Sequence, residues 1–189
     1  MKAILPCILF ALAAAGCATC PCNPAPEETM TLYQFSSETG TGGWEIQNDS
    51  VMGGVSQSSL AVSEDGKAVF SGAISLENNG GFASFQREFP VTDVSAYRTL
   101  LLRLKGDGKR YQVRVESEPG ARHGYAFEFP TSGEWQVIEI PFEQMYAIHH
   151  GDRLDLPNYA GDTLTHIQII AGDGRAETFR LEVDQIWVQ

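Results

Sequence analysis

Two short polar stretches of the chain hold most of the side chains suited to recognising a ligand. The first runs from Asn48 to Ser56 and contains the pair Gly53-Gly54, and the second runs from Glu77 to Phe82 with two asparagines and two glycines. Amide and carboxylate groups form hydrogen bonds with polar ligands. The same residue types also build tight turns, because Asn and Asp bond to nearby backbone and Gly adopts positive φ. Turn formation is the commoner role, and a binding role stays open beside it.

Two apolar residues, Val51 and Met52, interrupt the first polar stretch. A turn that only faces solvent would carry polar residues at these positions. We therefore expect the two side chains either to pack under neighbouring structure or to contact a partner. Methionine suits the second role, because its flexible thioether adapts to different surfaces.

Enzyme motifs are missing from the sequence. No nucleophile elbow, phosphate loop or dinucleotide fingerprint occurs. A hydrolase would need a carboxylate pair such as Asp49 with Glu77 or Glu116, at a separation that the sequence does not fix. No zinc-ligand spacing occurs among the four histidines, which are His123, His149, His150 and His166. We therefore expect no catalytic residue, no metal and no cofactor, and a protein that is not an enzyme.

Composition narrows the class of protein further. The chain has 189 residues and a formal net charge of -11. This length suits one domain with a sizeable core, and the acidic balance argues against nucleic acid as a partner. All four cysteines lie near the start of the chain, so we expect no disulfide in the folded body. They are Cys7, Cys17, Cys20 and Cys22.

The first residues have the pattern of an export signal. Residues 1–16 combine one early lysine with an apolar run that is short for a membrane span, which predicts a signal peptide. The run ends in Ala14-Ala15-Gly16-Cys17, which resembles a bacterial lipobox and predicts lipidation of Cys17. By analogy with bacterial sorting, Ala18 after the cysteine favours the outer membrane, facing the periplasm. Cleavage of a simple secretory peptide is the alternative.

Residues 17–29 are expected to form a Pro-rich, acidic tether. Prolines keep such a spacer extended, so it would hold the folded domain away from the bilayer. Cys20 and Cys22 flank Pro21 and offer a second possibility, metal binding or oxidation. We expect the folded domain to occupy residues 30–189.

The folded domain has the pattern of an all-β protein. Short runs of alternating apolar and polar residues recur between turn signals, and no long stretch has a helical period. We expect Arg98–Lys105 and Lys109–Glu116 to pair as a hairpin around the Gly-Asp-Gly turn. Its outer face would then carry a polar, partly cationic stripe. The candidate binding residues from this alternation are Arg103, Gln112 and Arg114.

Residues 142–158 show no clear alternation and are expected to be irregular, with one helical turn at residues 143–148. No internal repeat of 20–50 residues is visible.

Several ordered motifs resemble the complex I intermediate-associated protein 30 family, and the resemblance covers about Tyr33 to Val188. It implies a galactose-binding-like jelly-roll β-sandwich, which agrees with the strand pattern. The motifs are Trp44, the stretch Asn48–Ser56, Phe70-Ser71-Gly72, Asn78–Phe82, Lys105–Tyr111, Glu134-Trp135, Ile140-Pro141-Phe142 and Phe179-Arg180-Leu181. The candidate site residues within them are Asn48, Asp49, Ser50, Met52, Asn78 and Asn79.

The resemblance also implies a function. Mitochondrial members of this family assist the assembly of respiratory complex I as chaperones without catalysis. We therefore expect a non-enzymatic binding module that assists assembly or folding of a respiratory or envelope protein partner. The alternative is a carbohydrate-binding module of the envelope. In it Trp44 and Phe82 would form an aromatic platform beside the polar residues of the two turns.

Overall fold

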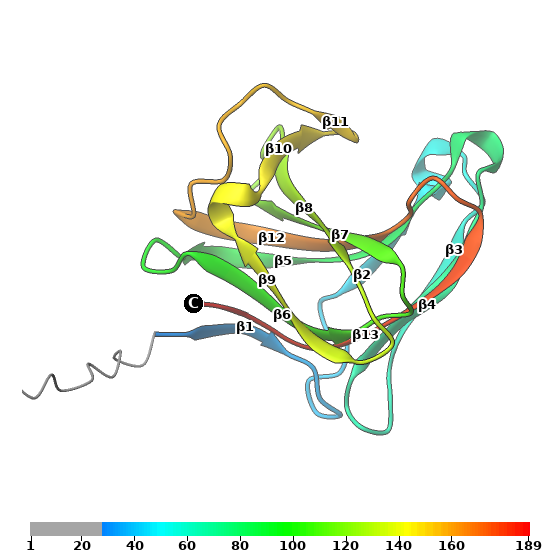
Figure 1. The fold of residues 1–189 in the computed structure, drawn as a ribbon, viewed down its shortest axis with the longest axis horizontal. Coiled ribbons are helices and arrows are strands. Elements are labelled where there is room, and N and C mark those ends of the chain that lie inside the picture. Colours follow the sequence, from blue (N-terminus) through cyan, green and yellow to red (C-terminus); the bar gives the residue numbers. More distant parts are fainter. Residues whose placement is uncertain (1–27) are drawn as a thin grey trace, which may run out of the picture.

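The computed structural model describes residues 28–189, which fold as two antiparallel β-sheets packed face to face (Figure 1). The predicted signal peptide, Cys17 and nearly all of the tether lie outside the described residues. Within the described part, no helix is long and apolar enough to cross a membrane. The six-stranded sheet consists of β1 (Met30–Gln34), β3 (Gln57–Val62), β4 (Ala68–Ile74), β6 (Thr99–Lys105), β9 (Trp135–Pro141) and β13 (Glu177–Val188).

The second sheet has seven strands, in the order β11-β10-β8-β7-β12-β5-β2. Three short 3-10 turns complete the described structure: η1 (Asp49–Met52), η2 (Glu77–Asn79) and η3 (Phe142–Gln144). The seven strands are β2 (Glu45–Asn48), β5 (Ala83–Asp93), β7 (Arg110–Glu116), β8 (Gly124–Pro130), β10 (Tyr146–His149), β11 (Asp152–Arg153) and β12 (Thr163–Ala171).

The core lies between the two sheets, where the inward residues of both alternating patterns meet. Phe70 of β4 contacts Phe85 of the opposite sheet, with ring centroids 4.8 Å apart, and also contacts Phe179 at 4.7 Å. Trp44 packs against Phe35 and Phe85 and is 7% exposed. Burial of such rings is a main source of stability in a sandwich. The all-β fold expected from the sequence is confirmed.

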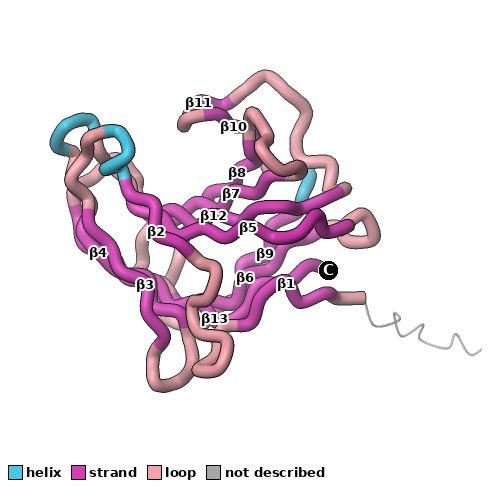
Figure 2. Tube along the Cα trace, turned by 180° about the vertical axis from the view of Figure 1, so that it is seen from behind, coloured by secondary structure: helices cyan, strands magenta, loops and turns pink. Residues whose placement is uncertain are grey.

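Strands far apart in the sequence lie side by side. The C-terminal strand β13 pairs with β4, β6 and β1, so it joins both halves of the chain in the six-stranded sheet (Figure 2). Neighbours in the sequence also pair, since β3 and β4 form a hairpin with Leu60 opposite Phe70. A jelly-roll sandwich therefore forms through many long-range pairings.

The expected hairpin of β6 and β7 is wrong. β6 pairs with β13 and β9 in one sheet, whereas β7 pairs with β8 and β12 in the other. The segment between them crosses from one sheet to the other, and the Asp107 carboxylate accepts a hydrogen bond from the backbone amide of Arg180 on β13. The alternating apolar residues of both strands are nevertheless all buried, because the inner faces of the two sheets oppose each other. They are Leu100, Leu102, Leu104, Tyr111, Val113 and Val115.

Residues 142–158 are more regular than expected. The helical turn is confined to Phe142–Gln144, and Tyr146–His149 forms β10, which pairs with β8. β11 then pairs with β10 and widens the seven-stranded sheet. In Figure 1 these two strands and the following loop lie at the end of the sheet opposite to η1 and η2.

Candidate functional site

The two polar turns, residues 48–56 and 77–82, are held together by one buried carboxylate. Asp49 is fully buried and accepts hydrogen bonds from the Ser56 amide at 3.0 Å and from the Ser56 hydroxyl at 2.5 Å. It also accepts hydrogen bonds from the amides of Gly81 at 2.7 Å and Phe82 at 3.3 Å, in the second turn. Burial alone raises the pKa of Asp49, but these donors outweigh it and the net pKa is lowered. Asp49 is therefore a structural link between the turns.

Two glycines make room for this carboxylate. A Cβ atom at Gly54 would lie 2.4 Å from the Asp49 Cγ atom, and one at Gly80 would lie 2.6 Å from its Oδ2 atom. Both distances are shorter than the contacts that Cβ atoms make in proteins. Each position therefore has room only for glycine. The glycines of the two motifs thus serve the Asp49 link.

The other motif residues divide between structure and surface. Asn78 and Asn79 are exposed and adopt left-handed φ values of 56° and 60°, which asparagine tolerates better than most residues. Asn48 is partly buried and its side chain accepts a hydrogen bond from the Ser58 hydroxyl at 2.7 Å. Ser50 is exposed on η1. The turns therefore use Asn chiefly for backbone conformation and for a link to β3.

Val51 and Met52 are exposed, at 66% and 64% of their surface. They do not pack beneath the second turn. Both instead line a groove on the outer face of the seven-stranded sheet, the face that points away from the core. The Asp49 link fixes the turn that presents them, so this apolar edge is rigidly placed.

The groove has a volume of about 920 Å³ and crosses several strands of the sheet. A smaller hollow of about 420 Å³ lies beside it and shares Glu128 and Gly151. The walls combine planar polar side chains with a few apolar ones. The lining residues include Gln47, Val51, Met52, Phe82, Arg110, Gln112, Arg114, Glu128, Gln168, Ile170, Asp173 and Arg175.

Arg114 lies in the middle of the groove, with Gln168 beside it on β12 and Ala126 beside it on β8. Its Nε atom donates a hydrogen bond to Gln112 Oε1 at 2.5 Å, and Gln112 Nε2 donates to the Tyr146 hydroxyl at 3.3 Å. Tyr146 of β10 is the cross-strand neighbour of Ala126. Ala126 has only a methyl group, so the side chains of Gln112 and Tyr146 can meet above it. The sheet therefore builds a connected polar surface across three strands.

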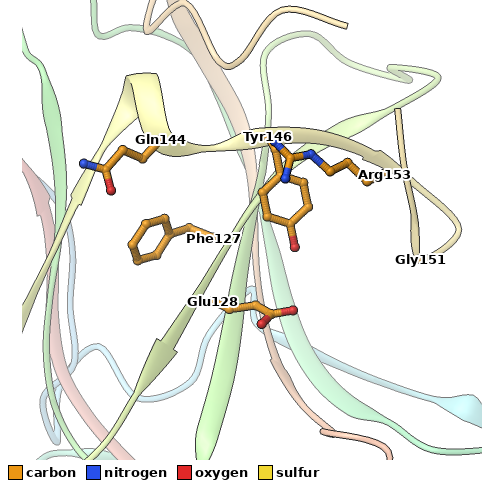
Figure 3. Close-up of a pocket in the computed structure, with 6 residues that line it drawn as sticks. All are labelled: Phe127, Glu128, Gln144, Tyr146, Gly151 and Arg153. Carbon is orange, nitrogen blue, oxygen red and sulfur yellow. The ribbon is translucent and has the colours of Figure 1, made fainter. Parts of the chain in front are cut away.

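Tyr146 is covered on one side by an arginine. The Arg153 guanidinium carbon lies 4.7 Å from the centre of the Tyr146 ring, a cation–π contact. In Figure 3 the Tyr146 hydroxyl points toward Glu128, whereas Phe127 and Gln144 lie apart from this group. Burial raises the pKa of the Tyr146 hydroxyl, so it stays protonated and can donate a hydrogen bond.

The other half of the groove continues the polar surface. Gln168 is largely buried, and its Nε2 atom donates to the Ser84 hydroxyl at 2.9 Å and to Gln47 Oε1 at 3.3 Å. The Ser84 hydroxyl donates to the backbone oxygen of Gln47. These bonds fix the side-chain amides of Gln47 on β2 and Gln168 on β12, with Ser84 of β5 between them.

Acidic residues also lie on the same sheet face, two residues further along the strand from Arg114. His166 of β12 lies between Glu88 and Glu116, with its Nδ1 atom 3.6 Å from Glu116 Oε1. Burial raises the pKa of Glu116, and Glu88 raises it further. Burial lowers the pKa of His166, and Glu88 opposes that shift. This end of the sheet face favours the less charged forms of its groups.

The sequence-predicted site residues do not all come together. Gln112, Arg114 and Met52 line the groove, and Asp49 holds the turn that carries Met52. Arg103 lies on β6 in the other sheet, where it pairs with Asp184 and covers the Trp135 ring. The stripe that was to combine Arg103 with Gln112 and Arg114 therefore does not exist. Trp44 is buried, so it forms no aromatic platform for a sugar.

Sequence reasoning missed half of the groove. Gln168 lies between the buried Ile167 and Ile169, and that alternation was a signal for an outward polar residue. Tyr146 and Arg153 belong to strands that the sequence pattern did not indicate. No local signal in the sequence pointed to these two residues.

The geometry gives no support to the hydrolase alternative. Both oxygens of Asp49 are occupied by donors within its own link, so Asp49 is not available to pair with Glu77 or Glu116. Among residues 28–189, no group of three or more His, Cys, Asp or Glu side chains is placed to hold a metal ion.

The two packed sheets define a galactose-binding-like jelly-roll β-sandwich. The structure is similar to the Family 11 Carbohydrate-Binding Module from Clostridium thermocellum in complex with a β-1,3-1,4-mixed-linked tetrasaccharide. The TM-score is 0.59 at 16% sequence identity, over 85% of this chain and 94% of that chain. A likeness at this identity concerns the fold alone.

The chain belongs to the Complex I intermediate-associated protein 30 family, whose sequence model matches residues 33–183. It is 25% identical to the mitochondrial Complex I intermediate-associated protein 30 of Mus musculus, over 86% of this chain and 56% of the relative. It is 30% identical to a probable mitochondrial member from Caenorhabditis elegans, over 85% of this chain and 54% of the relative. The chain thus spans about half the length of the curated relatives it matches.

Proposed function

We propose that the protein is a non-enzymatic binding module whose groove holds an extended segment of a protein partner. The observation that carries this proposal is the exposure of Val51 and Met52 at the edge of the groove. Exposed apolar side chains on a rigid turn are a common feature of protein contact surfaces. The Asp49 link keeps them from folding back into the core.

Membership of the family supports a role in assembly. The relatives are named for their association with intermediates of complex I, and we propose that this chain likewise acts as an assembly or chaperone-like factor for a respiratory or envelope protein. A groove of preformed polar groups with an apolar edge suits a segment that passes across several strands. The same module needs no catalytic group for such a role.

The proposed location is the bacterial cell envelope, with a lipid on Cys17 that anchors the chain to the outer membrane on its periplasmic side. The lipobox-like residues before Cys17 support this part of the proposal. Labelling with a radioactive fatty acid tests it, since Cys17→Ser would abolish the label. Labelling that persists in the variant would contradict the anchor.

Site-specific photo-cross-linking tests the contact surface. A photoreactive amino acid replaces Met52 in the full chain, produced in the cells that naturally make the protein. We expect one discrete adduct with a protein. Val91 is the matched control, because it is apolar and 61% exposed but does not line the groove. Equal adducts at both positions, or none at Met52, would contradict the proposal.

Carbohydrate binding is the second candidate function. The fixed amide planes of Gln47 and Gln168 favour it, because sugars are recognised by planar hydrogen-bonding groups. The structural neighbour with a bound tetrasaccharide shares the fold. A panel of neutral oligosaccharides, titrated against the wild type and Gln168→Ala, tests this candidate. Saturable binding that the variant loses would favour it over a protein partner.

A further inference from the structure

The charges of the groove are not balanced. Among its lining residues, Arg110 pairs with Glu128 at 3.3 Å, and Arg175 lies 3.9 Å from Asp173. Both acidic residues of the lining, Glu128 and Asp173, are therefore already in ion pairs. Arg114 lines the groove as well, and Arg153 lines the adjoining hollow. Neither forms an ion pair with any residue from 28 to 189. The middle of the groove is therefore cationic in a chain whose net charge is -11.

Arg114 is the more informative of the two arginines. It is partly buried, and burial lowers its pKa, which means that its charge is poorly solvated. Only its Nε atom has a hydrogen-bond acceptor within the described structure, namely Gln112 Oε1. The terminal amino groups of the guanidinium have none there. These groups form the side of the fork that binds a carboxylate with two parallel hydrogen bonds.

Two further acids on the same sheet face, besides Glu128, form no ion pair with Arg114 in the described structure. Glu116 lies two residues along β7 and is directed to His166, 3.6 Å away. Glu88 lies beyond His166 on β5. A partly buried cation without a counter-ion costs folding energy, so an arginine kept there points to a ligand that supplies the negative charge.

We propose, on the basis of the binding role above, that the groove selects an acidic protein segment and that Arg114 receives one of its carboxylates. Arg153 lies on the far side of Ala126 and Tyr146 and adds a second positive charge. Val51, Met52 and Ile170 provide contacts for apolar side chains next to the acidic residue.

The covered face of Tyr146 and the burial of Trp44 favour a peptide over an acidic sugar. Sugars stack on open aromatic faces, but Arg153 covers one face of Tyr146, and Trp44 is buried. Exposed Val51 and Met52 offer nothing to sugar hydroxyls, whereas they suit the apolar side chains of a peptide. Charge therefore selects an acidic ligand, and the apolar edge selects a peptide.

A random peptide library, displayed on phage and selected against the full chain, tests this inference. We expect selected peptides to share an Asp or Glu at a fixed distance from an apolar residue. The best peptide should lose about tenfold to a hundredfold in affinity with Arg114→Gln, the range for loss of a bidentate charge-assisted pair. Replacing its acid by the corresponding amide should cause a similar loss.

Arg122→Gln is the matched control, because it removes the same charge from an exposed position outside the groove. It should leave the affinity unchanged. Arg114→Lys should recover only part of the affinity, because an ammonium group keeps the charge but not the fork. Thermal unfolding of each variant verifies that it remains folded.

Three results would overturn the inference: selected peptides without a shared acid, failure to select any peptide, or equal binding by Arg114→Gln. Binding of oligogalacturonate with no peptide would retain the carboxylate chemistry but refute the peptide. If the Met52 cross-link forms and is unaffected by Arg114→Gln, the binding role survives and only the acidic selectivity fails. If neither the cross-link nor any peptide appears, the proposed function fails as well.

Discussion

Asp49 and Arg114 are both charged side chains withdrawn from water, and their surroundings differ completely. Asp49 has no cationic partner among residues 28–189, yet its carboxylate accepts hydrogen bonds from Ser56, Gly81 and Phe82. Arg114 bonds to one amide oxygen and leaves its terminal amino groups open to the groove. The first charge is satisfied by the fold itself. The second would be satisfied by the acidic ligand that we propose for the groove.

The difference separates the buried part of the family motif from the polar floor of the groove that we propose to bind a ligand. The residues around Asp49 match the family motifs and secure two turns. The residues around Arg114 follow no recognisable motif and come from strands that are distant in sequence. The motif around Asp49 therefore supplies the support and the apolar edge formed by Val51 and Met52, whereas Arg114 in the middle of the groove lies outside any motif.

The largest effect on stability is expected from Asp49→Ala. The change leaves buried amides of both turns without an acceptor and leaves a cavity beside Gly54 and Gly80. We expect a loss of about 3 kcal/mol in the free energy of unfolding. Chemical denaturation measures it, and Asp65→Ala in the exposed turn between β3 and β4 is the control. A loss no larger than in that control would mean that Asp49 is not the link between the turns.

Gly54→Ala should have the next largest effect. The added methyl group would lie 2.4 Å from Asp49 Cγ, so the turn or the carboxylate must shift. We expect a loss of about 2 kcal/mol, in the range for overpacked sites. Gly133→Ala is the matched control, because a Cβ atom there meets no other atom within 4 Å. Similar unfolding midpoints for the two variants would contradict the crowding.

Acid should remove part of the Asp49 contribution. The pKa of Asp49 is lowered in the folded protein, so its ionised form contributes stability that is fully present above the ordinary value of 3.8. The contribution is lost as the pH falls through the lower, folded pKa. Unfolding followed between pH 2 and pH 6 should show a shallower acid limb for Asp49→Asn than for the wild type. Parallel acid limbs would refute this assignment.

The smallest effect has the opposite sign. Arg114→Leu removes a poorly solvated charge and should raise the free energy of unfolding by about 0.5–1 kcal/mol. Arg103→Leu is the contrasting variant. Arg103 pairs with Asp184, so its removal should lower the free energy of unfolding. Thermal unfolding of the two variants under the same conditions compares them. Destabilisation by Arg114→Leu would mean that the arginine serves the fold rather than a ligand.

The sequence pattern predicted the fold well because alternation reports which residues face the core. It could not tell a hairpin from a crossing between sheets. Leu104 and Tyr111 point into the core in either arrangement, so the same pattern fits both. Long-range pairing decides between the two arrangements, because β13 and β9 occupy both edges of β6 and leave none for β7.

The site was harder to predict than the fold. Gln112 and Arg114 were found by alternation, and Met52 by its place in a polar turn. Arg153 belongs to a strand of two residues, which is too short for any periodic signal. Its position over Tyr146 depends on pairing with β10, and no local pattern in the sequence contains that information.

The position of β1 has a practical consequence. β1 pairs with the end of β13 in the six-stranded sheet, whereas the groove opens on the outer face of the other sheet. Whatever is attached ahead of Met30 therefore joins the sandwich on the layer that does not carry the groove (Figure 1). A biosensor chip coupled through an N-terminal tag should leave the groove free to meet its analyte.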